Sequence, residues 1–163
     1  MNADPIPART RAMRRAEREI VERAEVEAVL SRADVLSLAL CDEPAPYVIP
    51  VSFGYEEGTL YVHSAPRGSK LDLIARDPHV GFSAHADYAL VRGDAACDFA
   101  VRASSVVGTG IARVVTDERE KLRGLDAIMR HYGESRPVYR QETLARTCLV
   151  AIAVQSMRAK RVG

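Results

Sequence analysis

The stretch from residue 47 to residue 74 constrains the fold more than any other part of the chain. A β-rich run, residues 47–55, is followed by turn residues 56–58 and by a second β-rich run, residues 59–63. Two such runs joined by a short turn containing glycine are typical of a β-hairpin. Hairpin strands pair antiparallel, whereas a parallel pair needs a crossover connection of about a dozen or more residues. The sequence therefore predicts an antiparallel sheet.

The remaining segments add strands and helices to this hairpin. Short apolar runs predict further strands, and apolar residues at helical spacing predict helices. The connection 89–103 is expected to be irregular, and residues 158–163 are expected to form a polar tail. Sequential strands that do not alternate with helices favour a mainly β (α+β) chain, a six-stranded closed or nearly closed barrel with peripheral helices. The expected strands are 35–40, 47–55, 59–63, 80–86, 106–115 and 145–154, and the expected helices are 16–33, 71–77 and 117–132.

The length of the chain bounds its domain organisation. With 163 residues it is long enough for one domain with a substantial core and short for two. We expect a mobile N-terminal arm over residues 1–15, which has few large apolar side chains, and a single domain over residues 16–163. The first residues lack a signal-peptide core, and no run approaches the roughly 18 apolar residues of a membrane span. A cytoplasmic location is therefore expected.

The charges of the chain nearly balance. Lysine and arginine number 23 and aspartate and glutamate 22, so the formal net charge is +1. This balance argues against a global attraction to nucleic acid or to an anionic membrane surface, and any bound anion must be held locally. The three cysteines, Cys41, Cys97 and Cys148, lack the paired spacing of metal sites and are expected to be buried free thiols. No metal site is predicted.

The segment from His63 to Lys70 has the composition of a phosphate site. It ends a strand, passes through a loop and opens a helix, where Ser69 and Lys70 supply a hydroxyl and a cation. The first backbone N–H groups of a helix are unpaired, and the helix dipole favours an anion beside them. The residues also admit a structural interpretation, in which Ser69 caps the helix and Lys70 is solvated. The sequence leaves both interpretations open.

The run from Pro50 to Tyr55 is unusual for a strand. Proline removes a ladder donor, and Gly54 has no side chain to pack. A flat ring stacked on the backbone would explain this composition, and so would a bend or bulge of the barrel. From the physics of the residues alone, the bend is favoured.

Several motifs distributed over the chain occur together. They are Pro46-Tyr47-Val48-Ile49-Pro50-Val51-Ser52-Phe53-Gly54-Tyr55, Leu60-Tyr61-Val62-His63-Ser64-Ala65, Gly68-Ser69-Lys70-Leu71-Asp72, Ala96-Cys97-Asp98-Phe99 and Ser104-Ser105-Val106-Val107-Gly108-Thr109-Gly110. In combination they resemble the FMN-binding split barrel of the pyridoxamine 5′-phosphate oxidase-like superfamily, and most closely its nitroimidazole-resistance branch. The resemblance covers residues 14–160 approximately. It implies a homodimer in which two subunits build two equivalent FMN sites at their interface.

The resemblance also assigns expected roles to particular residues. It implies that Val51–Phe53 and His63–Ala65 line the isoalloxazine ring and that Ser69 and Lys70 hold the phosphate. The segment Ser104–Val106 is expected near a cofactor, which could be that of the same subunit or that of the other subunit. The candidate cofactor-binding residues are therefore Pro50, Val51, Ser52, Phe53, His63, Ser64, Ala65, Ser69, Lys70, Ser104, Ser105 and Val106.

The chain also departs from the pattern of this branch. Larger or charged residues of the Tyr and Arg types are expected where Ala103 and Ser104 stand, and a tryptophan where Phe99 stands. These differences are expected to alter part of the phosphate or dimer contact. The further substrate-binding arginine and histidine residues of the oxidase that makes pyridoxal phosphate have no counterpart that we identify in the C-terminal part. Vitamin B6 oxidation is therefore not the predicted activity.

His63 is the candidate catalytic residue. An isolated histidine more often has a structural role, but an imidazole beside a flavin could donate a proton to a bound nitro or carbonyl group, or hydrogen-bond it. The leading hypothesis is a reductase in which FMN accepts hydride from a nicotinamide donor and passes electrons to a small electron-poor acceptor, such as a nitroaromatic.

Two alternatives from other classes remain open. The first is a non-catalytic protein that binds flavin, deazaflavin or haem for storage, sensing or transfer, with His63 or His85 available as a haem ligand. The second is a purely structural dimer with an empty cleft. Bound flavin that turns over with a nicotinamide donor would distinguish the reductase from both.

Overall fold

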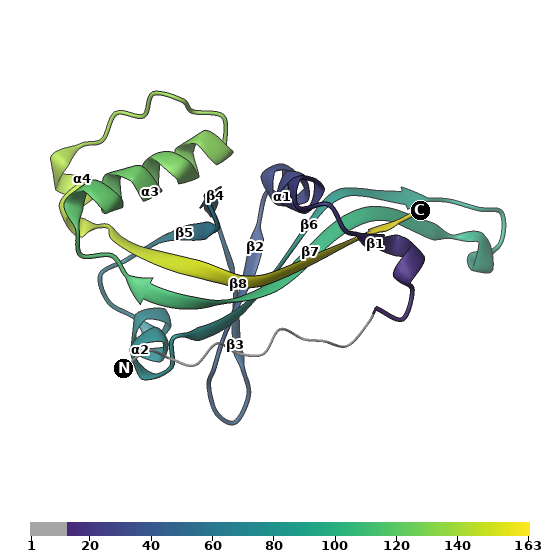
Figure 1. The fold of residues 1–163 in the computed structure, drawn as a ribbon, viewed down its shortest axis with the longest axis horizontal. Helices are drawn as coiled ribbons and strands as arrows, with labels where there is room; N and C mark the ends of the chain where they lie inside the picture. Colours follow the sequence, from purple (N-terminus) through teal and green to yellow (C-terminus); the bar gives the residue numbers. More distant parts are fainter. Residues whose placement is uncertain (1–12) are drawn as a thin grey trace.

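The computed structural model describes residues 13–163, which form one antiparallel sheet with helices around it (Figure 1). The predicted N-terminal arm lies outside the described residues except for residues 13–15. The strands are β1 (Glu19–Ile20), β2 (Leu36–Leu40), β3 (Tyr47–Val51), β4 (Gly54–Glu56), β5 (Thr59–Ser64), β6 (His79–Val91), β7 (Ala100–Val114) and β8 (Cys148–Val162). The helices are α1 (Arg23–Arg32), α2 (Ser69–Arg76), α3 (Glu118–His131) and α4 (Gln141–Arg146), with 3-10 turns at Ala16–Arg18 and Ala96–Asp98.

The sheet corrects the prediction of a six-stranded barrel. Within residues 13–163 it contains eight strands, in the order β3-β2-β6-β7-β8-β5-β4, with β1 paired to β8. Its two end strands, β3 and β4, are consecutive in the chain, but they lie at opposite edges of the sheet and the barrel is not closed. The hairpin predicted over residues 47–63 is therefore formed only by β4 and β5, while β3 pairs with β2. The chain crosses from one edge to the other at Ser52 and Phe53, which we call the seam.

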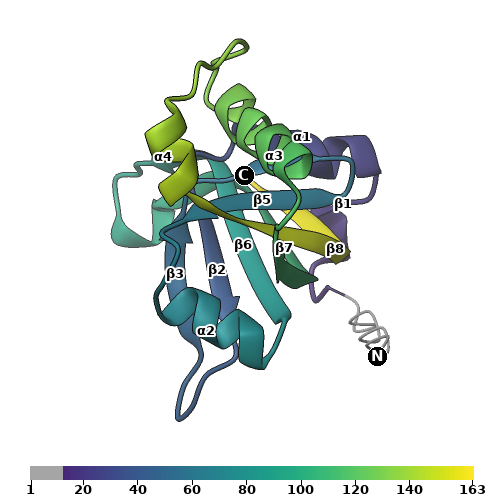
Figure 2. The ribbon, with the colours of Figure 1, turned by 90° about the vertical axis from the view of Figure 1, so that its left-hand side faces the viewer.

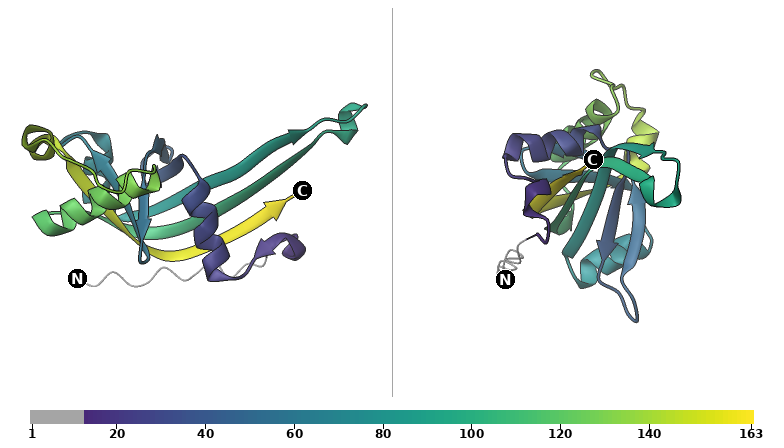
Figure 3. Two further views of the ribbon diagram at one scale, coloured as in Figure 1. Left: turned by 90° about the horizontal axis from the view of Figure 1, so that it is seen from above. Right: turned by 90° about the vertical axis from the view of Figure 1, so that its right-hand side faces the viewer.

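The irregular connection predicted over residues 89–103 is shorter than expected, because β6 and β7 form one long hairpin and leave only residues 92–99 between them. Figures 1 and 3 show this hairpin projecting from the body of the molecule. The register shifts between Ala86 and Ala89, where Asp87 adopts a positive φ of 59° and accepts hydrogen bonds from Arg32 on α1. This bulge interrupts the alternation of apolar residues, which explains why the sequence did not reveal the strand.

The two ends of the described chain pair with each other. Glu19 and Ile20 lie opposite Lys160 and Ala159, so the predicted helix 16–33 forms only from Arg23 onward. Burial of Ile20 against the sheet overrides the helical spacing of that segment. Residues 158–163, expected to be a polar tail, form the end of β8 as far as Val162.

The core lies between the inner face of the sheet and the helices. In β2, Leu36, Leu38 and Leu40 are buried and alternate with residues of the outer face, as expected for a strand covered on one side. Helix α1 packs on β6, β7 and β8, and α3 packs on β4 and β5 (Figure 2). The short helix α4 was not predicted, and Cys41 and Cys97 are exposed rather than buried, although all three thiols are free.

No helix within residues 13–163 is long and apolar enough to cross a membrane.

Candidate functional site

The seam is held by the end of α3. The backbone N–H of Phe53 donates to the Tyr132 hydroxyl at 3.2 Å, and that hydroxyl donates to the Asp34 carbonyl at 2.8 Å. The Phe53 ring is fully buried, with its centroid 4.3 Å from that of His131, whose Nε2 lies 2.7 Å from the Ala33 carbonyl oxygen. Phe53 therefore cannot offer its side chain to a surface ligand, whereas the neighbouring Ser52 is exposed.

Gly54 is explained by the same helix. A Cβ atom on Gly54 would lie 2.4 Å from the backbone carbon of Ala127 and 2.4 Å from the backbone nitrogen of Ile128. The backbone of α3 thus occupies the space that a side chain would need. The unusual composition of residues 50–55 is explained by the break between β3 and β4 and by the close approach of α3. The structure therefore favours the bend over a stacked ring as the reason for this composition.

Pro50 lies in the edge strand β3, where a missing N–H disrupts little. Pro50 is exposed and Val51 is half-buried. The register pairs Gly54 with Tyr61, so Ser52 and His63 each lie two residues beyond this pair. The antiparallel arrangement brings the exposed part of the seam to the same end of the sheet as His63.

His63, Ser64 and Ala65 end β5 at the surface. His63 pairs with Leu149 and Ser64 with Cys148 at the start of β8. The His63 and Ala65 side chains are exposed, and that of Ser64 is half-buried. The imidazole of His63 is therefore accessible to a ligand that approaches the seam.

The loop after β5 leads into α2 through Gly68. Gly68 is the N-cap, with a φ of 134° that disfavours other residues, and its carbonyl accepts the N–H groups of Leu71 and Asp72. Ser69 is therefore the first helical residue and not the cap, which corrects the capping interpretation. No side chain caps α2, so the N–H groups of Ser69 and Lys70 remain without an intrahelical acceptor. One acid, Asp72, lies in this first turn.

Lys70 is a half-buried cation beside these N–H groups. Its Nζ donates to the His63 carbonyl oxygen at 3.4 Å, a long hydrogen bond. Burial lowers the pKa of Lys70, and the nearby Cys148 thiol opposes this effect in part. Among the residues that the structure describes, no carboxylate forms an ion pair with Lys70. Lys70 is therefore partly shielded from solvent, and both interpretations of this residue stay predictions.

Ser104, Ser105 and Val106 lie far from this group in the same chain. Ser104 pairs with Arg161 near the end of β8, whereas Ser64 pairs with Cys148 at its beginning. At about 3.3 Å per residue, these two positions of β8 are separated by up to about 40 Å along the strand. Ser104 and Val106 are buried, and Ser105 is half-buried on the outer face. Within one chain, the two segments therefore lie at opposite ends of β8.

The outer face of the sheet carries small side chains. The register aligns Ala39 with Val48 and with Gly81, and Gly81 with Thr109. A hollow of about 620 Å³ lies on this face, and Val48 and Val107 on its lining are 58% and 53% exposed. This face therefore leaves apolar side chains open to solvent.

The sequence did not reveal the residues that support the seam. His131 ends α3 and Tyr132 follows it, and the two contact residues 33, 34 and 53, which are distant in the sequence. The sequence showed only that these two residues lie at the end of a predicted helix, and this position does not indicate which residues they contact. His79 likewise has a partner, since its Nδ1 lies 2.7 Å from Asp77.

Known proteins resemble this chain in sequence and in fold. The family model described as pyridoxamine 5′-phosphate oxidase matches residues 22–161. The chain belongs to this family. The solved structure of a candidate 5-nitroimidazole antibiotic resistance protein from Bacteroides thetaiotaomicron is 31% identical, with a TM-score of 0.78 over 89% of this chain and 87% of that chain.

Other matches extend the pyridoxamine 5′-phosphate oxidase fold to proteins with further cofactors. The FAD and haem binding protein of Mycobacterium smegmatis has a TM-score of 0.76 at 20% identity, over 89% of this chain and 73% of that chain. An uncharacterised protein of Rhizobium meliloti (strain 1021) is 31% identical over 61 residues, 37% of this chain. That match spans 40% of the length of the curated relative.

Proposed function

We propose that this member of the pyridoxamine 5′-phosphate oxidase family is an FMN-binding reductase. It would pass electrons from a nicotinamide donor to a small electron-poor acceptor of the nitroaromatic type. The observation that carries the proposal is Lys70, a half-buried ammonium group at the start of α2 with no carboxylate partner among the described residues. A phosphate would neutralise this charge.

The residues around Lys70 fit the phosphate of FMN. The ammonium group and the uncapped N–H groups of Ser69 and Lys70 supply donors and positive potential in one place. The Gly68 backbone conformation leaves space in front of them, because a Cβ at this position would contact no atom within 4 Å. The exposed Asp72 carboxylate in the same turn reduces the attraction in part.

The other end of the cofactor would lie toward the seam. Bound FMN supplies the hydride and electron transfer chemistry, which no side chain of the protein provides. Val51 and Ser52 would border the ring with their backbone and side chains. The buried Phe53 would not touch the ring, but its backbone N–H, bound to the Tyr132 hydroxyl, would fix the position of Ser52. The exposed His63 imidazole is available to hydrogen-bond the acceptor or to give it a proton.

A homodimer is part of the proposal. Ser105 would reach a cofactor only in a second copy, because it lies at the opposite end of β8 from Ser64. The small side chains of the outer sheet face would allow the two sheets to approach closely, and Val107 would be covered there. Two equivalent sites follow from a twofold arrangement of this kind.

Titration of the flavin-free protein with FMN, followed by flavin fluorescence, tests the cofactor. We expect binding that weakens at least about tenfold in Lys70→Ala, the range expected for a lost charge-assisted contact. Lys121→Ala removes the same charge from α3, where the ammonium group donates to the Leu144 carbonyl, and should leave FMN affinity unchanged. FAD titrated in parallel tests the choice of flavin. Equal affinity of wild-type and Lys70→Ala for FMN would refute the site.

Turnover separates the reductase from a binding protein. A nicotinamide donor and a nitro compound should give oxidation of the donor that falls in His63→Ala while FMN remains bound. The second candidate, a non-catalytic flavin, deazaflavin or haem protein, is favoured by the fold shared with the FAD and haem binding protein of M. smegmatis. Bound FMN that no donor reduces would support that candidate against the reductase.

A further inference from the structure

A second group of cations gathers at the opposite end of the molecule from Lys70. Arg14, Arg15 and Arg18 precede β1, and Lys160 lies in β8, which pairs with β1. Together with Met13 and Val162 they line a hollow of about 400 Å³. Within the part of the chain that the structure describes, no acid lines this hollow.

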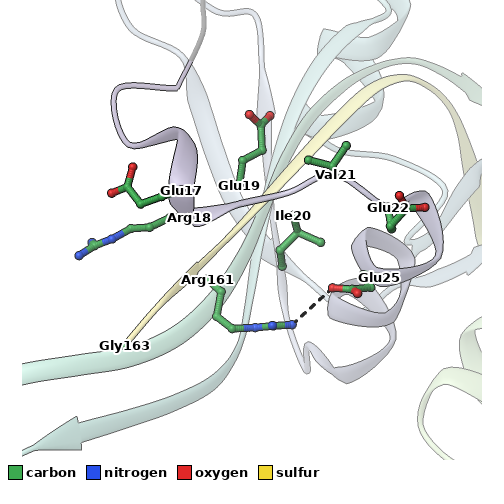
Figure 4. A pocket seen from close by; sticks show the side chains of 9 residues that line it. All are labelled: Glu17, Arg18, Glu19, Ile20, Val21, Glu22, Glu25, Arg161 and Gly163. Carbon is green, nitrogen blue, oxygen red and sulfur yellow. Dashed lines mark ion pairs between the residues drawn. The ribbon is translucent and has the colours of Figure 1, made fainter.

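Three cations on neighbouring elements each pair with an acid. Arg158 pairs with Glu19 at 2.7 Å, Arg161 with Glu25 at 3.7 Å, and Arg32 with Asp87 at 3.0 Å. Figure 4 shows the adjacent hollow, where Arg161 faces Glu25 and four glutamates line the wall. Of these four glutamates, Glu19 and Glu25 pair with Arg158 and Arg161, and none of the four lines the basic hollow.

The four cations of the basic hollow remain without such partners. Arg14, Arg15, Arg18 and Lys160 form no ion pair with any residue of the range 13–163. The Arg18 side chain is half-buried, and it also borders the adjacent hollow that Figure 4 shows with its four glutamates. A concave surface lined by charges of one sign concentrates its potential and attracts counter-ions.

We infer that this hollow binds the phosphate groups of a small phosphorylated ligand. Guanidinium groups match phosphate oxygens through paired N–H donors, and Lys160 adds a point charge. The volume of about 400 Å³ suits one or two phosphate groups with a small organic portion, and it is a local hollow rather than an extended basic surface. The near balance of charge in the whole chain also disfavours a nucleic acid or a membrane as the occupant.

Two sources of phosphate share this chemistry. One is a free phosphorylated metabolite, and the other is the pyrophosphate of a nicotinamide dinucleotide, the donor in the proposed reductase. The assignment of the dinucleotide rests on that proposed function, whereas anion binding does not. The test is therefore made on the flavin-free protein with inorganic pyrophosphate as the probe.

Isothermal titration of pyrophosphate at low salt is the measurement. The double variant Arg18→Gln/Lys160→Gln should bind pyrophosphate at least about fivefold more weakly than wild-type, as expected for two partly exposed charge contacts. The control Arg161→Gln/Arg130→Gln removes two cations that have acid partners, Glu25 and Glu56, and should stay within about twofold of wild-type. FMN is titrated into the double variant in parallel, because Lys160 pairs with Ser105, which the proposed dimer brings to the cofactor of the second copy. FMN affinity within about twofold of wild-type would support a separate site, and a loss as large as that for pyrophosphate would assign the hollow to the FMN site and overturn the proposal.

Competition identifies the source. Displacement of pyrophosphate by NADPH or NADH, lost in Arg18→Gln/Lys160→Gln, would support the dinucleotide, and pyrophosphate binding without such displacement would support a free phosphorylated ligand. Pyrophosphate binding that is absent, or equal in wild-type and the double variant, would overturn the site. Binding of DNA or of phosphatidylserine vesicles in place of pyrophosphate would overturn it as well, because it would show a surface for macromolecular polyanions.

Discussion

The Tyr132 hydroxyl accepts a hydrogen bond from the backbone N–H of Phe53 at 3.2 Å, across 79 residues of sequence. The same hydroxyl donates to the Asp34 carbonyl, so one side chain joins the seam to the segment before β2. The sheet supplies no ladder at this point, because β3 and β4 lie at opposite edges. A helix side chain therefore replaces a backbone pairing.

Tyr132→Phe should destabilise the protein by about 1–2 kcal/mol, because the Phe53 N–H loses its acceptor in a partly buried place. Urea denaturation followed by circular dichroism measures the change. Tyr88→Phe is the control, since Tyr88 is 63% exposed and should shift the free energy of unfolding by less than about 0.5 kcal/mol. Identical stability of Tyr132→Phe and wild-type would show that water satisfies the Phe53 N–H.

Gly54→Ala should be destabilising by at least about 2 kcal/mol, because the new Cβ meets the backbone of α3 at 2.4 Å and backbone yields little. Gly81→Ala is a matched change in the same sheet. Its Cβ would lie 3.8 Å from that of Ala39, an ordinary contact, and we expect a melting temperature close to wild-type. Similar melting curves for the two variants would contradict the close approach of α3.

Lys70→Met should raise the melting temperature of the flavin-free protein at neutral pH. Burial lowers the pKa of Lys70 in the folded state, so its charged form opposes folding wherever the lysine is protonated in both states. The penalty is full below the folded pKa and disappears as the pH rises above the unfolded value. The stability gain of Lys70→Met should therefore shrink at strongly alkaline pH, and a constant gain would point to packing alone.

Val107→Arg should prevent assembly through the outer sheet face. The side chain is 53% exposed on the hollow of that face, and a guanidinium group there would remain unpaired in a twofold contact. Sedimentation velocity should give a monomer for Val107→Arg and a dimer for wild-type. Val138→Arg, at a site that is 95% exposed in the loop before α4, is expected to remain dimeric. A dimeric Val107→Arg would place the interface elsewhere.

Local patterns predicted part of the fold. The alternation of apolar residues in β2 and the apolar face of α3 can be recognised from the residues of each element alone. The start of α3 is local as well, because Asp117 caps it by accepting from the Glu120 N–H. The β6–β7 hairpin could not be recognised in the same way, because the bulge at Asp87 breaks its alternation. The break at Ser52 and Phe53 depends on which strands pair, and pairing is decided by contacts distant in the sequence.

The site shows a similar division. The strand, loop and helix from His63 to Lys70 are contiguous, and the sequence alone was enough to predict their arrangement around a helix start. The burial of Lys70 and its proximity to Cys148 arise from β8, about eighty residues later, and required the structure. The roles of Ser104–Val106 stay a prediction, since they concern a second copy of the chain.

The proline of β3 has a consequence for the solution behaviour of the protein. A sheet with two open edges can recruit strands from other molecules, which is a common route to aggregation. Here one edge contains Pro50, which has no N–H to offer, and the other edge, β4, is only three residues long. The open edges of the unclosed barrel therefore offer few backbone hydrogen-bonding groups with which strands of other molecules could pair.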